Sequence, residues 1–516
     1  MISAPFDDRA RDLVNRLRRD LLAADYTVES VRALWGDEAD TALQRGNRVP
    51  ARRALAAMSD TSAACALARV FLLGDACEAA ALAPALPALG IDGAVLLGLV
   101  AHAADRLEPL LDLRPYAALD AGGTAAWWIL SDLSEQVRRG ALPADHVLGV
   151  GGASLTLAGL IPTSVVERVL DLGTGCGIQS LHAARHARVV VATDTSLRAL
   201  RLAAITLRLN GTDAVELRQG DLFAPVTGEL FDRIVSNPPF VITPRREGVP
   251  LYEYRDGGRV GDGIVEEVVR GTADHLAPGG TAHLLGNWEY RDALGGDGLA
   301  RVRRWVEEAG LDAWIVERGR QSPAQYAETW IRDGGTLVGS HDFEQLAEQW
   351  LDDFSHRGVT AVGFGYIVLR KPPAGGHSAL LRTERLPEPL GGAQTGIGDH
   401  LMLGFAAHDA TGHLDDTQLA TLRLQVAGDV TDERHQWPGA DGPTVMRLRQ
   451  GGGFGRVIEA DAALAGLVGA CDGELSVGQI VGALAELLEV QESALLAELL
   501  PTVRELLLTG MLLLEQ

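Results

Sequence analysis

A chain of 516 residues is longer than one ordinary core, so we expect two or three domains. Apolar residues make up 47% and charged residues 22%, which excludes disordered and fibrous classes. The net charge is −23, and residues 376–516 contribute −12 of it, with 8 basic against 20 acidic residues. No segment has the basic excess that is typical of nucleic-acid-binding proteins.

Signals for export, membrane insertion and metal binding are missing from the sequence. No apolar run reaches the roughly 18 residues of a membrane helix, and residues 1–20 are charged throughout. The four cysteines, Cys65, Cys77, Cys176 and Cys471, lie far apart without a CxxC pair. We therefore expect a cytoplasmic protein that binds no membrane, no zinc and no other metal.

The first predicted domain covers residues 1–140 and is mainly helical. Apolar residues at helical spacing predict helices at 8–22, 27–43, 62–73 and 91–104. The stretches 107–117 and 125–131 alternate like strands. Helices followed by a short hairpin favour a winged-helix-like module.

The second predicted domain, residues 141–374, alternates strands and helices in the α/β manner. Strands are predicted at 168–172, 189–193, 214–218, 231–236, 281–285, 313–317 and 362–369. Their spacing predicts a Rossmann-like core of seven strands. The long connection 318–360 contains two helical patterns, which we expect to cover the active site.

A third domain is predicted at residues 378–516, after the Pro- and Gly-rich linker 371–377. Strand patterns occur at 421–426 and 444–450, and helical patterns at 475–488 and 492–508. A short apolar strand closes the chain. This order again favours a mainly helical, winged-helix-like domain.

A glycine-rich turn follows the first strand of the α/β domain, in VLDLGTGCGIQS (169–180). Gly173, Gly175 and Gly177 remove the Cβ atoms that would block a ligand. A dinucleotide site would have the spacing G-x-G-x-x-G, whereas here it is G-x-G-x-G. The turn suits a ligand without phosphates, such as the methionine part of S-adenosylmethionine (SAM); alone, it is equally compatible with a simple tight loop.

Carboxylates at the ends of the next two strands make SAM the predicted cofactor. Asp194, nineteen residues after Gly175, is placed to accept both ribose hydroxyls, and Asp221 to accept the adenine amino group. Leu222 offers a backbone N–H to the adenine ring. Asp171 is expected to order the turn. The candidate cofactor residues are Asp171, Gly173, Thr174, Gly175, Asp194, Thr195, Asp221, Leu222 and Asn237.

The candidate catalytic residues are Asn237, Pro238, Pro239 and Phe240, which follow the fourth strand. Two successive prolines fix the backbone, so the Asn237 side-chain oxygen and the Pro238 carbonyl point in fixed directions. These two acceptors match the two hydrogens of an –NH2 group and can stabilise the positive charge that develops on nitrogen during methylation. Phe240 is expected to pack on a planar substrate. The alternative is a stiff loop that only terminates the strand.

With these motifs, residues 168–286 resemble class I SAM-dependent methyltransferases of the HemK/PrmC type. GDLFAPVTGELFDRIVSNPPF is close to their pattern, and DGGRVGDGIVEEVV (256–269) is similar to the Gly-rich stretch that follows in them. The resemblance implies a SAM-dependent enzyme that methylates a protein glutamine. Phe240 stands where glutamine methyltransferases commonly have Tyr, and NPPF also occurs in guanine-N2 rRNA methyltransferases.

Three functions therefore stay open. A protein substrate is favoured, because none of the thirds 1–150, 151–375 and 376–516 is net basic. The second is methylation of adenine N6 or guanine N2 in RNA or DNA, guided by the end domains. The third is a SAM-binding regulator without catalysis, which the intact Asn237-Pro238-Pro239 sequence disfavours. No feature of the sequence indicates an oligomeric state.

Overall fold

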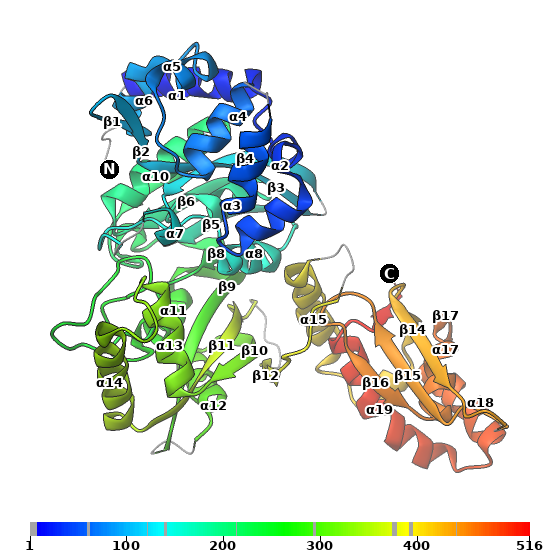
Figure 1. Ribbon diagram of the computed structural model, residues 1–516. Coiled ribbons are helices and arrows are strands. Elements are labelled where there is room, and N and C mark those ends of the chain that lie inside the picture. The colour runs from blue at the N-terminus through cyan, green and yellow to red at the C-terminus, as the bar shows by residue number, and fades with distance from the viewer. Residues whose placement is uncertain are drawn as a thin grey trace.

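The computed structural model describes residues 8–58, 62–120, 122–138, 142–212, 214–292, 296–373, 379–391, 396–439 and 441–515. Both predicted domain boundaries, near residue 140 and at 374–378, lie outside the described residues. The N-terminal helices lie at one end of the molecule, above the central sheet, and the C-terminal region lies to one side of it (Figure 1).

A mixed eight-stranded sheet forms the centre, in the order β12-β10-β11-β9-β8-β5-β6-β7. Its strands are β5 Val166–Leu172, β6 Ala187–Asp194, β7 Glu216–Gln219, β8 Phe231–Ser236, β9 Leu276–Arg291, β10 Asp312–Gln321, β11 Val359–Arg370 and β12 Leu381–Arg385. Strands β5 to β9 are parallel, and β11 is antiparallel to both β9 and β10. All seven predicted strands are present, and the α/β Rossmann-like class is confirmed.

The eighth strand, β12, lies beyond the predicted linker and pairs in parallel with β10. All of its residues are exposed or only partly buried. An edge strand without a fully buried face shows no clear alternation of apolar and polar residues, so the sequence pattern did not reveal it. The sheet therefore continues past residue 374.

Side chains on alternate faces of the sheet build two separate cores. The covering helices are α8 Gly152–Leu160, α9 Ile178–Ala184, α10 Leu197–Leu209, α11 Gly263–His275, α12 Gly298–Ala309 and α15 Ile397–Thr411. On β9, Leu284 packs with α11 and α12, whereas Leu285 packs with α8 and α15. With both faces covered, the carboxyl ends of the parallel strands remain available at one edge of the sheet for ligands.

The N-terminal region packs its helices and two hairpins against α9 and α10. Its elements are α1 Asp8–Ala23, α2 Val28–Gln44, α3 Val49–Ala57, α4 Ala63–Leu67, the π-helix η1 Ala68–Leu72, α5 Ala79–Leu82, the 3-10 helix η2 Ala83–Ala85, α6 Gly90–Leu97, β1 Val100–Ala103, β2 Arg106–Pro109, β3 Leu111–Asp120, β4 Gly123–Asp132 and α7 Glu135–Arg138. Trp128 on β4 joins the layers: its backbone N–H donates to Asn210 Oδ1 at 2.9 Å, and its Nε1 donates to the Tyr26 carbonyl at 2.7 Å.

The helix predicted at 91–104 is wrong in its second half. Helix α6 ends at Leu97, and Gly98 adopts the left-handed conformation with φ 78°. Glycine takes this conformation readily and commonly ends helices. The chain then forms β1, which pairs with β2 in a hairpin.

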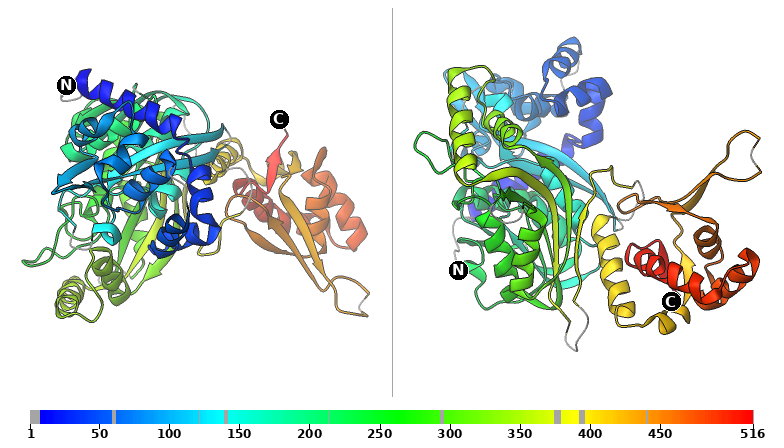
Figure 2. Two further views of the ribbon diagram at one scale, coloured as in Figure 1. Left: turned by 45° about the horizontal axis from the view of Figure 1, so that its top comes forward. Right: turned by 90° about the horizontal axis from the view of Figure 1, so that it is seen from below.

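The C-terminal region has its own apolar core and two three-stranded sheets. Its elements after α15 are α16 Asp416–Ala420, β13 Arg423–Val426, β14 Val430–His435, β15 Val445–Gln450, β16 Val457–Ala460, α17 Ala462–Gly469, β17 Asp472–Ser476, α18 Val477–Leu488, α19 Glu492–Leu508 and β18 Leu512–Leu514. The β14–β15 hairpin extends away from the body of the protein (Figure 2). Two ion pairs, Arg370–Asp409 and Arg456–Glu384, each at 2.6 Å, join the region to the central sheet.

Among the described residues, no single helix is both long and apolar enough to cross a membrane. The bent pair Ala79–Ala85 and Gly90–Leu97 satisfies those criteria only when its two helices are taken together.

Candidate active site

The turn after β5 leaves open space above its glycines. Gly173 and Gly175 have φ values of 80° and 54°, in the region that residues with a Cβ adopt rarely. A Cβ atom built on either glycine would have no heavy atom within 4 Å. The backbone conformation therefore requires glycine here, and the space above the turn is free for a ligand.

Asp171 lies beneath this turn and holds it in place. Its Oδ2 accepts hydrogen bonds from the hydroxyls of Thr174 at 2.7 Å and Ser180 at 2.6 Å. Burial raises the pKa of Asp171 to about 6, although these two hydroxyls favour the charged form. The side chain is buried under the turn, in agreement with the expectation that it orders the turn.

Asp194 ends β6 and ties the glycine turn to the next strand. Its Oδ2 accepts the Gly175 N–H and its Oδ1 accepts the Ser196 N–H, each at 2.9 Å. Burial raises the pKa of Asp194. Each carboxylate oxygen has further lone-pair capacity, so both can still accept a ribose hydroxyl.

Asp221 and Leu222 follow β7, on the more open side of the site. The Asp221 side chain is exposed and lies 3.3 Å from the Arg259 guanidinium. Leu222 has a positive φ of 44°, which is uncommon for a residue with a Cβ. Such strained residues gather at ligand sites, and the turn brings the Leu222 backbone to the same cavity as Asp194.

The Asn-Pro-Pro-Phe loop begins directly after β8. Asn237 Oδ1 is buried, yet it accepts no hydrogen bond from the described residues. A buried acceptor without a partner costs about 1–3 kcal/mol, so a ligand donor would relieve it. The Pro238 carbonyl already accepts the Phe240 N–H at 2.7 Å, which leaves one lone pair of the predicted second acceptor for a substrate.

The connection between β10 and β11 packs against the back of this loop, and none of its described residues lines the cavity, so its covering of the active site stays a prediction. It forms α13 Pro323–Asp333 and α14 His341–His356, which pack Tyr326, Trp350 and Phe354 against the chain at Phe240 to Ile242. The Tyr326 hydroxyl accepts the Ile242 N–H at 3.1 Å and the Asn287 side-chain N–H at 2.7 Å. The Asn-Pro-Pro-Phe loop, which we call the reaction loop, is therefore supported from behind by buried hydrogen bonds.

A cavity of about 240 Å³ brings most of the predicted residues together at the carboxyl edge of the sheet. The predicted residues that line it are Gly173, Thr174, Gly175, Asp194, Thr195, Asp221, Leu222, Asn237, Pro238 and Pro239. Asp171 and Phe240 lie outside the lining. Phe240 is partly buried among apolar side chains and forms a bridge with Asp256, so its contact with a substrate stays a prediction.

Comparisons with known proteins agree with this geometry. The family described as methyltransferase small domain matches residues 149–294, and two domains of unknown function, DUF7059 and DUF7782, match residues 23–110 and 409–514. Ribosomal protein uL3 glutamine methyltransferase of Bradyrhizobium diazoefficiens is 40% identical over 129 residues, 23% of this chain and 40% of that protein. Release factor glutamine methyltransferase of Xylella fastidiosa is 32% identical over 210 residues, 35% of this chain and 73% of that protein. This chain belongs to the family of class I SAM-dependent methyltransferases of the HemK/PrmC type.

Other proteins similar to this chain are named for RNA. Ribosomal RNA small subunit methyltransferase C of Escherichia coli is 32% identical to this methyltransferase over 147 residues, 28% of this chain and 38% of that protein. A solved Thermus thermophilus 16S rRNA N2 G1207 methyltransferase, in complex with AdoMet and guanosine, has 24% identity and a TM-score of 0.27. That structural match covers 43% of this chain and 56% of the other.

Among the residues that line the cavity of the methyltransferase without having been predicted are His146, Glu253, Tyr254 and Asp256. They come from irregular segments. The rule that ligands bind at the carboxyl ends of parallel strands, which located Asp194 and Asn237, therefore does not predict them. The one available signal was the Asp-Gly-Gly sequence that begins at Asp256. Burial lowers the pKa of His146, whose ring packs edge-on against Tyr254 with 5.6 Å between centroids.

Asp256 presents a second unpaired acceptor. Its Oδ1 accepts from Arg245 and from the Gly258 N–H, whereas its buried Oδ2 has no hydrogen-bond partner among the described residues. Asn237 and Asp256 both line the cavity, and each has one buried oxygen without a partner among the described residues, Asn237 Oδ1 and Asp256 Oδ2. Both can accept an N–H from a ligand.

The charge of the cavity is negative. Asp194, Asp221, Glu253 and Asp256 line it, and none of the described lining residues is Arg or Lys. The nearby Arg245 pairs with Asp256, and Arg246 pairs with Asp352 at 3.2 Å. Among the described residues, no group of three or more His, Cys, Asp or Glu side chains has the arrangement of a metal site.

Proposed function

We propose that this methyltransferase transfers the methyl group of SAM to a planar amide nitrogen of a protein, in first place a glutamine side chain. The observation that carries the proposal is the unpaired, buried Asn237 Oδ1 in a cavity lined by carboxylates. The two hydrogens of an –NH2 group would satisfy this acceptor and the unpaired Asp256 Oδ2.

The residues present fit SAM. The open space above Gly173 and Gly175 suits the methionine part, Asp194 the ribose hydroxyls, and Asp221 with the Leu222 N–H the adenine. When bound, SAM supplies an electrophilic methyl group on a positively charged sulfur. The carboxylates around it favour a cation in the cavity.

The protein's own task is to hold a weakly nucleophilic nitrogen in place. An amide nitrogen has its lone pair delocalised into the carbonyl, so it attacks poorly in its planar form. Asn237 Oδ1 would accept one N–H and draw the nitrogen towards tetrahedral geometry, with the lone pair directed at the methyl carbon. The new N–C bond forms as the S–C bond breaks, and the nitrogen then releases one proton to solvent.

We assign the second acceptor to Asp256 Oδ2, with the Pro238 carbonyl in support. The Pro238 oxygen already accepts the Phe240 N–H, whereas Asp256 Oδ2 is buried and unpaired. A carboxylate also stabilises the positive charge that develops on nitrogen more strongly than a neutral carbonyl. Arg245, which donates to the other oxygen, would fix the orientation of the carboxylate.

A protein substrate is favoured over a nucleic acid by the charge of the chain and by two of its relatives. Nucleic-acid sites neutralise phosphates with Arg and Lys, whereas each third of this chain, 1–150, 151–375 and 376–516, has a net negative charge. Two of the relatives are named glutamine methyltransferases, for a ribosomal protein and for a release factor. A base of RNA remains the second candidate because a further relative is named for ribosomal RNA. The proposed location is the cytoplasm.

Transfer of labelled methyl from SAM into an extract of the source cells tests the proposal. Wild type and Asn237→Ala are compared, with protease and nuclease digestion in parallel. We expect a label that the wild type introduces, the variant does not, and protease removes. A label that nuclease removes would establish the RNA or DNA reaction instead. No label in either sample, with SAM bound normally, would indicate a regulator.

A further inference from the structure

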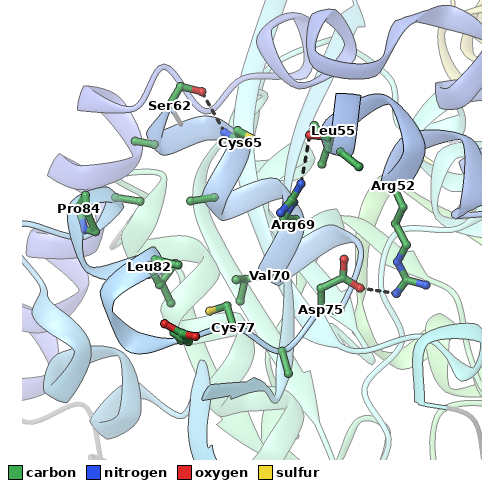
Figure 3. Close-up of a pocket in the computed structure, with 18 of the residues that line it drawn as sticks. Arg52, Leu55, Ser62, Cys65, Arg69, Val70, Asp75, Cys77, Leu82 and Pro84 are labelled. Carbon is green, nitrogen blue, oxygen red and sulfur yellow. Dashed lines mark hydrogen bonds and ion pairs between the residues drawn. The ribbon is translucent and has the colours of Figure 1, made fainter. Parts of the chain in front are cut away.

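A second and larger cavity, of about 1200 Å³, lies in the N-terminal region (Figure 3). Helices α3, α4 and α5, the π-helix η1 and the chain around Cys77 surround it. Alanines, Ala56, Ala66 and Ala81 among them, leave much of the space unfilled. Protein interiors are otherwise close-packed, and small-molecule sites span about 300–1,000 Å³, so this hollow has the scale of a ligand site.

The lining is positively charged, in contrast to the protein as a whole. The charged residues that line the cavity are Arg48, Arg52, Arg69, Arg106, Asp75 and Glu78. Four arginines thus face two carboxylates within a chain whose net charge is −23. The net negative chain repels an anion in solution, whereas the arginines attract it inside the cavity.

Arg69 is the arginine best placed to bind an anion. It is exposed, and its Nη2 donates to the Leu55 carbonyl at 3.1 Å, which orients the guanidinium without neutralising it. Among the described residues, no carboxylate lies within ion-pair distance of Arg69, whereas Arg52 pairs with Asp75. A guanidinium has five N–H donors, so most of those of Arg69 remain for a ligand.

Apolar side chains complete the wall around Arg69. Leu55, Val70 and Leu82 line the same cavity, and Figure 3 shows Leu82 across the hollow from Arg69. Arg69 and Val70 both belong to η1, a π-helix of five residues. Short π-helical segments are rare and occur frequently at functional sites, where they redirect side chains that a regular helix would place elsewhere.

We propose that this cavity binds a small anionic amphiphile, with its carboxylate or phosphate on Arg69 and its apolar chain against Leu55, Val70 and Leu82. The anion would form charge-assisted hydrogen bonds with the planar guanidinium, which suits both headgroups. The apolar chain would fill space that the alanines leave open, and its burial supplies the hydrophobic part of the affinity.

Fluorescence titration of the full chain with 1-anilinonaphthalene-8-sulfonate tests the proposal, with uncharged N-phenyl-1-naphthylamine as the matched probe. We expect the sulfonate to bind about tenfold more tightly than the neutral probe, and Arg69→Gln to raise its Kd about tenfold. Arg53→Gln is the control, because Arg53 is exposed on α3 outside the lining, and it should leave the Kd unchanged. Equal Kd values for the two probes, or for wild type and Arg69→Gln, would overturn the proposal.

Competition identifies the headgroup and the place of binding. Dodecanoate or dodecyl phosphate should displace the sulfonate probe, and the stronger competitor identifies the preferred headgroup. Cys77 lines the cavity and is half-buried, whereas the other three cysteines are buried, so alkylation at Cys77 reports on occupancy. Saturating competitor should slow this alkylation at least about threefold in the wild type. Displacement by neither compound, or unchanged alkylation of Cys77, would refute the assignment even if Arg69→Gln fails to fold.

Discussion

The hydroxyl oxygen of Tyr326, on α13, accepts a hydrogen bond from the backbone N–H of Ile242 at 3.1 Å. Ile242 lies five residues after Asn237, and Tyr326 is buried behind the reaction loop. The contact links the helical connection behind the loop to the residues that we expect to hold the substrate. Stability and catalysis should therefore depend on the same hydroxyl.

Tyr326→Phe should reduce both properties together. The change leaves the Ile242 N–H and the Asn287 side-chain N–H without their acceptor, at a cost of about 1–3 kcal/mol in the free energy of unfolding. A loop that moves by a fraction of an ångström misplaces the substrate nitrogen, so kcat should fall roughly tenfold. Urea unfolding and single-turnover transfer measure the two effects.

Tyr116→Phe is the control for this prediction. The Tyr116 hydroxyl bonds His182 Nε2 at 3.0 Å on the N-terminal side of the sheet, away from the reaction loop. Tyr116→Phe should lower the unfolding free energy and leave kcat unchanged. Equal loss of kcat in both variants would show that Tyr326 acts through general stability alone.

Asn237→Ala should abolish transfer while SAM still binds. Removal of the acceptor leaves the amide N–H without the partner that polarises it, and loss of one such contact typically reduces kcat about 10²–10³-fold. The Kd for SAM, measured by calorimetry, should stay within about threefold, because Gly173, Gly175 and Asp194 are untouched. A variant that loses SAM and transfers normally when saturated would reverse the assigned roles.

Asp256→Asn tests the second acceptor. The amide keeps one acceptor oxygen but removes the negative charge opposite the developing cation, so kcat should fall roughly tenfold with little change in KM. Glu253→Gln is the matched control: it removes one negative charge from the same cavity, and Glu253 has no assigned role in transfer. If Glu253→Gln reduces kcat as much as Asp256→Asn does, the total charge matters and not the oxygen of Asp256.

Asp194→Asn should weaken SAM binding more than Asp221→Asn. A hydrogen bond to a charged acceptor contributes about 1.5–3 kcal/mol, which corresponds to an increase in Kd of roughly 10- to 100-fold. Asp221 is exposed and already lies beside Arg259, so its replacement should raise the Kd less than about tenfold. The opposite order would contradict the assignment of the ribose to Asp194.

As pH rises, the unfolding free energy of the wild type should decrease relative to that of Asp171→Asn. The pKa of this buried carboxyl is raised from 3.8 to about 6 in the native state. The native state therefore binds the proton more tightly than the unfolded chain, and this contribution is complete below pH 3.8 and lost as pH rises through about 6. The difference in unfolding free energy should change by at most about 3 kcal/mol across this window.

Ser180→Ala gives an independent check of this linkage. It removes the hydroxyl that donates to Asp171 Oδ2 at 2.6 Å and favours the charged carboxylate. The midpoint of the pH dependence should move upward. A midpoint that stays in place would show that Asp171 is not the titrating group.

The sequence located the parts of the site that lie at strand ends. Asp194 and Asn237 could be found because a strand pattern ends directly before each of them, and the parallel order brings their strand ends to one edge. The successive prolines, Pro238 and Pro239, also predicted a rigid loop. These signals are local in the chain, so no tertiary information was needed to read them.

Site residues that do not lie at strand ends were missed. His146 and Asp256 reach the cavity through irregular segments whose course depends on packing, here against Tyr254 and Arg245. The strand β12 was missed because it has no fully buried face. The turn at Gly98 ends α6 although the apolar pattern continues, since burial in β1 and in a helix produces similar runs of apolar residues.

The central claim is that the methyl group is transferred to an amide nitrogen held by Asn237, and the chemistry of the product tests it most directly. Protein labelled by the wild type with [methyl-¹⁴C]SAM is hydrolysed completely in hot acid, and the label is separated by volatility and by amino-acid analysis. An N-methyl amide is cleaved to methylammonium, so we predict a label that becomes volatile, as methylamine, only after the hydrolysate is made alkaline, and that Asn237→Ala yields none. Label retained on a methylated lysine, arginine or histidine, or released as methanol, would contradict the account.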